Sequence, residues 1–150
     1  MKVVLQRVSN ASVSVEKKII SEISMGLLIL VGLTESDTIV DIQWLTKKII
    51  SLRIFEDENG VMNRSLLETN GEVIVVSQFT LMASTKKGNR PSYIQAAKPE
   101  TAIPIYEQFI KQFEKDLGKK IGTGIFGANM KVALTNDGPV TIIIDTKNKY

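Results

Sequence analysis

Histidine and cysteine are both absent from the 150 residues of this sequence. Their absence excludes disulfides, thiolate nucleophiles, haem and iron–sulfur ligation, and every Ser/His or Cys/His catalytic pair. A zinc site of the His/Cys type is also excluded, and a metal ion would need oxygen ligands, for which the spacing of an EF-hand is missing. We therefore expect no metal and no cofactor. An enzyme with this sequence would use an unusual general base, or none.

Long apolar runs are also missing. No run approaches the roughly 20 residues that span a bilayer, and Met1–Arg7 turns polar too early for a signal peptide. The sequence therefore predicts a cytoplasmic protein with no membrane partner. Its 43% hydrophobic and 23% charged residues exclude disordered and fibrous classes. The length is that of a single domain, 1–150, with a sizeable core.

Acidic residues are unevenly distributed, although the net charge is only +3. The stretch Val73–Lys98 contains no acidic residue, whereas Glu35–Glu72 contains eight. This imbalance predicts one basic and one acidic surface. The basic surface is either a set of solvated loop charges or a site for a polyanion. Its cations are Lys86, Lys87, Arg90 and Lys98.

The hydrophobic pattern predicts an α+β domain. Apolar residues recur every three or four positions from Asp37 to about Arg53 and from Pro99 to Leu117, which predicts two main helices. Because strands come in runs separated by single helices, we expect a mostly antiparallel, barrel-like sheet of about seven strands. The expected strands are Val3–Val8, Ser12–Val15 continuing through Ile19–Ile23, Leu27–Leu33, Val73–Val76, Ile121–Phe126, Met130–Leu134 and Val140–Asp145.

A polar cluster, Ser77-Gln78-Phe79-Thr80, follows the buried strand Val73–Val76. Polar groups at the end of a strand are well placed to build a site on a rigid scaffold. Alternatively, Ser77 and Thr80 only satisfy backbone groups where the strand ends. The polar stretch Met82–Lys98 that follows is predicted to be a long loop, and such loops are usually functional or mobile.

A second cluster, Asn136-Asp137-Gly138-Pro139, consists entirely of turn-forming residues. The simplest interpretation is an ordinary turn between the last two strands. Proline is also the residue that readily takes a cis bond. A rigid Gly138–Pro139 element of that kind would discriminate between ligands by exclusion.

Two other features are less informative. Arg7 lies within the first predicted strand, as either an edge charge or a buried partner for backbone carbonyls. The three glycines Gly122, Gly124 and Gly127 fit G-x-G-x-x-G, but a strand follows them instead of a helix. We therefore reject a dinucleotide-binding motif.

Taken together, these motifs resemble the D-aminoacyl-tRNA deacylase family from end to end. The Ser-Gln-Phe-Thr and Gly-Pro motifs are the most specific. The departures are modest: Ser24 stands where relatives often have glycine, and Tyr93 where phenylalanine is common. The matching segments are Gln6-Arg7-Val8, Ala11-Ser12-Val13, Gly26-Leu27-Leu28, Arg53-Ile54-Phe55, Ser77–Leu81, Gly88–Ser92 and Asn136–Thr141.

The resemblance implies a homodimer that hydrolyses the ester joining a D-amino acid, or glycine, to the 3′-terminal adenosine of tRNA. It implies that Gly138–Pro139 is cis and reaches into the other subunit's site to reject L-aminoacyl-tRNA, with Arg7 supporting the loop. The residues expected to line the pocket are Ser77, Gln78, Phe79 and Thr80. Those expected to meet tRNA phosphates are Lys86, Lys87 and Arg90.

Two mechanisms remain open at this point. An aminoacyl ester is already activated, so modest transition-state stabilisation is sufficient and no histidine is needed. We expect backbone N–H groups near Phe79 and Thr80 to stabilise the oxyanion while the 2′-hydroxyl of the adenosine helps to activate water. The rival is an acyl-enzyme on Thr80, although a neutral hydroxyl without a base is a poor nucleophile.

Two other classes of function compete with an enzyme. The first is a non-catalytic tRNA-binding module that uses only the basic loop, and the second is a small-molecule binding protein. Aromatic residues make up only 6% of the chain and most have core spacing. We therefore expect no aromatic surface for stacking RNA bases, which argues against the binding module.

Overall fold

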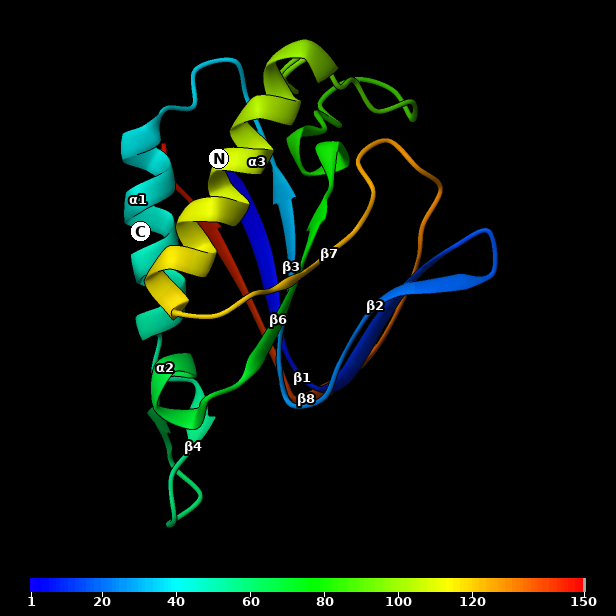
Figure 1. Cartoon of the computed structure of the whole chain (residues 1–150). Helices are drawn as coiled ribbons and strands as arrows, with labels where there is room; N and C mark the ends of the chain where they lie inside the picture. The colour runs from blue at the N-terminus through cyan, green and yellow to red at the C-terminus, as the bar shows by residue number, and fades with distance from the viewer. Residues whose placement is uncertain (150) are drawn as a thin grey trace.

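The computed structural model describes residues 1–149 and is shown in Figure 1. Helices α1 (Ile39–Ser51) and α3 (Pro99–Leu117) lie side by side against a six-stranded sheet. The strands of this sheet are β1 (Lys2–Val15), β2 (Lys18–Ile23), β3 (Gly26–Gly32), β6 (Glu72–Ser77), β7 (Gly122–Thr123) and β8 (Lys131–Asp145). The remaining elements are β4 (Phe55–Glu56), β5 (Met62–Arg64), the short helix α2 (Leu66–Thr69) and a 3-10 helix at Phe79–Met82.

The sheet is mixed. Its strand order is β2-β1-β3-β6-β7, and β8 also pairs with β1. Strand β1 is antiparallel to β2, β3 and β8, whereas β6 is parallel to both β3 and β7. The two parallel pairings depart from the predicted, mostly antiparallel sheet. They arise because the chain crosses through helices before it returns as β6 and again as β7.

The long strand β1 serves two parts of the molecule. Its first half pairs with β3, its second half pairs with β2, and β8 accompanies it along nearly its whole length. On the far side, the Ser21 hydroxyl of β2 donates to the Thr123 carbonyl of β7 at 2.5 Å and accepts the Thr123 N–H at 3.0 Å. The sheet thus curls into the nearly closed, barrel-like shape expected from the sequence.

Two hydrophobic cores occupy the two faces of this sheet. The larger one lies between the sheet and the helices, where Leu45 and Ile49 of α1 meet Phe109 and Phe113 of α3. The smaller one fills the barrel-like half and includes Val76 of β6. Strand β6 contributes to both cores, which fixes the position of its carboxyl end. None of the helices within residues 1–149 is long and apolar enough to cross a membrane.

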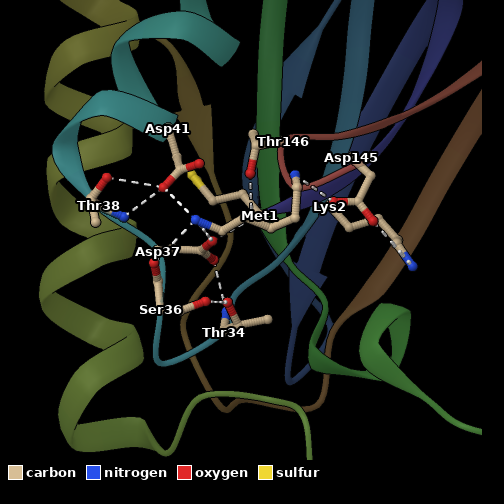
Figure 2. A network of polar contacts seen from close by, with 10 residues as sticks. Met1, Lys2, Thr34, Ser36, Asp37, Thr38, Asp41, Asp145 and Thr146 are labelled. Atoms are coloured by element: carbon tan, nitrogen blue, oxygen red, sulfur yellow. Dashed lines mark hydrogen bonds and ion pairs between the residues drawn. The ribbon is translucent and has the colours of Figure 1, made fainter. Parts of the chain in front are cut away.

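A buried charge pair joins the start of β1 to the loop before α1. The Met1 α-amino group is ion-paired with the Asp37 carboxylate, and both side chains are fully buried. The same amino group donates to the Thr146 hydroxyl at 2.8 Å, and the other Asp37 oxygen accepts the Thr34 N–H at 2.8 Å. Figure 2 shows these groups converging at one point. No pattern in the sequence indicated this network.

Candidate active site

A cavity of about 280 Å³ lies at the carboxyl end of β6. Ser77, Gln78 and Phe79 line one side of it, so three of the four residues in the predicted polar cluster meet there. The lining also includes Ala102, near the start of α3, and the segment Phe126–Met130 between β7 and β8. An apolar cavity with a few polar groups is the usual form of a small-molecule site.

The backbone at the end of β6 leaves two donors near this cavity. Ser77 is still paired with β3, and the next residue, Gln78, donates its N–H to the Val31 carbonyl at 2.7 Å. The chain then turns into the 3-10 helix that begins at Phe79. The N–H groups of Phe79 and Thr80 are the first two of this helix and have no acceptor within it.

Thr80 follows Phe79 in the chain but is not among the residues that line the cavity. The side-chain amide of Gln78 donates to the Thr80 hydroxyl oxygen, so the hydroxyl hydrogen is directed elsewhere. None of the side chains that line the cavity is titratable. Within residues 1–149 no group of three or more acidic side chains gathers as a metal site would require. A hydroxyl that accepts an amide donor and has no base beside it is a poor nucleophile.

Tyr106 of α3 packs next to Phe126, which lines the cavity. Its hydroxyl donates to the Val75 carbonyl of β6 at 2.9 Å, and its ring centroid lies 6.0 Å from that of Phe126. Burial raises the pKa of Tyr106 to about 12. The phenol therefore stays protonated at neutral pH, where it acts as a hydrogen-bond donor and not as a base.

Arg7 is a buried partner for backbone carbonyls, which was one of the two alternatives left open by the sequence. It is only 6% exposed. Its Nε donates to the Asp137 carbonyl at 2.9 Å and its Nη1 to the Ile54 carbonyl at 2.7 Å. The guanidinium thus ties the residue before Gly138 to the chain leading into β4.

Gly138 and Pro139 lie on an exposed part of β8, and the peptide bond between them is cis. The predicted turn at Asn136–Pro139 is wrong, because β8 runs without interruption from Lys131 to Asp145. The extra residues are absorbed as register shifts against β1 on both sides of Val8. For the same reason, the strands predicted on either side of this cluster are one strand.

The region after α3 also differs from the prediction. Only Gly122 and Thr123 of the predicted strand Ile121–Phe126 form β7. The rest of that segment leaves the sheet and becomes the cavity wall at Phe126–Met130. Strand β8 follows the three glycines. Ala102 and Phe126–Met130 were missed as site residues because neither carries a motif that marks a site.

The two predicted clusters do not meet within one copy of the chain. Arg7 pairs with Leu27 on β3, whereas Ser77 pairs with Val31, four residues further along the same strand. Strands β8, β1, β3 and β6 also lie side by side, so three strand spacings separate Gly138 from Ser77. At ordinary strand spacings the two sites are roughly 20 Å apart.

The third predicted group lies in the loop that follows the 3-10 helix. Ser84 and Ser92 exchange backbone hydrogen bonds of 2.8 and 2.9 Å, which closes the loop into a hairpin-like projection. Lys86, Lys87 and Arg90 are exposed at its tip. These three residues lie in the loop predicted from Met82 to Lys98. The loop starts one residue later than predicted, because Met82 is the last residue of the 3-10 helix.

Comparisons with known proteins agree over nearly the whole chain. The family model described as D-Tyr-tRNA(Tyr) deacylase matches residues 4–145. D-aminoacyl-tRNA deacylases of Flavobacterium psychrophilum and Bacteroides thetaiotaomicron are 68% and 65% identical to this chain over 149 residues, which is 99% of this chain and 99% of each relative.

Two solved structures have the same fold. One is described as a c-Myc DNA unwinding element binding protein, with a TM-score of 0.89, 41% identity, and coverage of 97% of this chain and 98% of the other. The second is described as a probable eukaryotic D-amino acid tRNA deacylase, with a TM-score of 0.82, 16% identity, and coverage of 95% and 97%.

Proposed function

The chain belongs to the D-Tyr-tRNA(Tyr) deacylase family, and we propose that it hydrolyses the ester bond of D-aminoacyl-tRNA, releasing the D-amino acid and tRNA. The observation that carries this proposal is that Ser77, Gln78 and Phe79 of the family-matching segment line a cavity. The enzyme would work in the cytoplasm, where aminoacyl-tRNA is made and used.

The catalytic power comes from backbone donors. When water attacks the ester carbonyl, the N–H groups of Phe79 and Thr80 stabilise the oxyanion, and one such donor is worth about 10²–10³ in rate. The cavity lining offers no base. The 2′-hydroxyl of the terminal adenosine therefore helps to activate the water, and the ester needs little further activation.

Selection for the D-amino acid comes from Gly138–Pro139 of a second copy of the chain. Backbone carbonyls of this element accept hydrogen bonds from the substrate's α-amino group and leave no room where an L side chain would point. Glycine has no side chain to exclude. Glycyl-tRNA is therefore hydrolysed as well.

The surface of the sheet supports a homodimer of this kind. Because Gly138 lies roughly 20 Å from Ser77 in the same chain, only another copy can bring the two together. Four apolar residues on neighbouring strands are paired in register, from Val76 at the cavity through Leu30 and Val4 to Ile143. Ile143, at the end of this row, is 53% exposed. A second copy packed on this face would cover the row.

The basic loop provides the contact to tRNA. Lys86, Lys87 and Arg90 are exposed and no acidic residue lies between Val73 and Lys98. Their charges attract the phosphates of the acceptor end, so tRNA affinity falls as the salt concentration rises.

Arg7→Ala is expected to reduce kcat/KM for D-tyrosyl-tRNA by about 100-fold, because a displacement of 1 Å near the reacting groups has an effect of that size. The variant loses the bonds to Asp137 and Ile54 that hold the segment before Gly138. Arg53→Ala is the matched control, since Arg53 also donates to a backbone carbonyl, at Asn63, but is exposed. Initial rates of both variants measure the difference, and equal rates would refute the supporting role of Arg7.

Thr80→Ala distinguishes the two mechanisms. If the backbone N–H groups stabilise the oxyanion, the variant keeps near-normal single-turnover deacylation of D-tyrosyl-tRNA, since alanine retains its N–H. If Thr80 were the nucleophile, the variant would have no acyl-enzyme route and would lose rapid single-turnover release of D-tyrosine. Rapid-quench measurement of released D-tyrosine with enzyme in excess reports the outcome.

A further inference from the structure

An exposed aromatic pair lies beside the cavity. Phe79 is 56% exposed and Tyr93 is 39% exposed, and their ring centroids are 5.1 Å apart with an interplanar angle of 74°. By contrast, the aromatic residues Phe109 and Phe113 are fully buried in the larger core. We expected no aromatic surface for stacking RNA bases, and this exposed pair was not foreseen from the sequence.

The pair lies between the cavity and the basic loop. Phe79 lines the cavity, and Tyr93 directly follows Ser92, whose hydrogen bonds to Ser84 close the base of the loop. The loop tip carries Lys86, Lys87 and Arg90. In Figure 1 this segment is the green loop near the start of α3. A strand of nucleotides that leaves the cavity toward the cationic tip would pass over the two rings.

We propose that Phe79 and Tyr93 form a platform on which the unpaired bases just before the terminal adenosine of the tRNA stack. This inference rests on the proposed deacylase function, which directs the terminal adenosine to the cavity. Unpaired bases are commonly held by stacking on aromatic side chains beside a basic groove, whatever their sequence. The platform thus binds a part of the substrate that takes no part in the reaction.

The charges around the pair favour a nucleic-acid strand. The segment from Val73 to Lys98 contains no acidic residue that would repel phosphates. Aromatic rings beside a loop that carries three cations match the base faces and phosphates of a single strand. The adjacent Ile94 is 89% exposed but has no ring, which makes it a suitable control position.

The test compares two substrates that share the same reacting ester. Tyr93→Ala should raise KM for D-tyrosyl-tRNA about tenfold, the effect of removing one stacked base. It should leave the hydrolysis of D-tyrosyl-adenosine, which lacks the other bases, unchanged. Tyr93→Phe should restore the KM for tRNA, because phenylalanine keeps the ring. Ile94→Ala should match the unmodified protein on both substrates.

Salt dependence separates stacking from charge. Tyr93→Ala should leave the slope of log affinity against log salt concentration unchanged. Lys87→Ala should reduce the magnitude of this slope by about one, because one phosphate contact is lost. An unaltered KM for tRNA in Tyr93→Ala would overturn the proposal. Equal losses on tRNA and on D-tyrosyl-adenosine would also overturn it, because Tyr93 would then only support Phe79. If the unmodified protein hydrolysed neither ester, the deacylase function itself would fail.

Discussion

Gly138→Ala is expected to lower kcat/KM for D-tyrosyl-tRNA by about 100-fold, as expected for a displacement of about 1 Å at a reacting site. Gly138 has a φ of +138°, a region that side-chain-bearing residues rarely adopt. A Cβ at this position would lie 2.8 Å from a methyl group of Val140 and 3.0 Å from Nη2 of Arg7. The Gly138–Pro139 element or the side chains packed against it must therefore shift, and initial rates on purified D-tyrosyl-tRNA measure the effect.

Gly60→Ala is the matched control for this prediction. Gly60 also has a positive φ, of +75°, but nothing lies within 4 Å of a Cβ added there. Both substitutions therefore place alanine in a disfavoured backbone conformation, and only Gly138→Ala disturbs the proposed selectivity element. Similar activities for the two variants would contradict a role for Gly138 in the site.

A mixture of two inactive variants tests whether Gly138 acts in the other subunit. Ser77→Phe fills the cavity of its own chain. Gly138→Ala disturbs the element that the chain contributes to its partner's site. In a symmetric dimer, random reassembly gives half mixed dimers with one intact site each, or about a quarter of normal activity. Reassembly without any recovery would show that both residues act within the same chain.

Asp37→Ala is expected to lower the free energy of unfolding by about 3–5 kcal/mol, the usual cost of leaving one partner of a buried ion pair alone. The Met1 α-amino group would keep only the hydroxyl of Thr146 at 2.8 Å as a close partner. Because one kcal/mol shifts the melting temperature of a domain of this size by about 2–4 °C, we expect a fall of about 10 °C.

Lys120→Ala provides the comparison for this second prediction. Lys120 forms a pair with Glu114 at 3.1 Å, but its side chain is 92% exposed. Exposed pairs of this kind contribute little to stability, so the melting temperature of Lys120→Ala should equal that of the unmodified protein. Urea unfolding of the two variants gives the difference in free energy. Equal stabilities would mean that burial of the Asp37 pair adds nothing to the fold.

The elements with a clear hydrophobic period could be predicted from the sequence, and their pairing could not. The helix ending at Gly118 was predicted because its apolar positions recur on one face and glycine adopts the positive φ of its C-cap. The parallel pairing of β3 with β6 could not be predicted, since buried strands of both orientations are continuous apolar runs.

The residues of Asn136–Pro139 were misinterpreted as a turn because each of them favours turns when considered locally. In the structure, pairing with β1 on both sides of Val8 outweighs these local preferences and keeps β8 extended. Short-range propensities cannot include such a partner, because β1 lies at the other end of the chain.

Half of the candidate site could be predicted from the sequence. Ser77–Thr80 was recognised because polar residues interrupt an apolar run, and three of its residues, Ser77, Gln78 and Phe79, line the cavity. The rest of the lining, at Ala102 and Phe126–Met130, has no comparable signal because its residues are mostly small or apolar and are distant in sequence from Ser77. Tyr93 was missed for another reason: composition does not reveal which aromatic residues are exposed.

The most direct test of the account is the deacylation of D-tyrosyl-tRNA and L-tyrosyl-tRNA by the purified protein, measured side by side with metal ions chelated. We expect rapid loss of the D-ester and survival of the L-ester. Survival of both esters would refute the deacylase function and indicate a tRNA-binding module without catalytic activity. Equal loss of both esters would contradict selection of the D-amino acid at Gly138–Pro139.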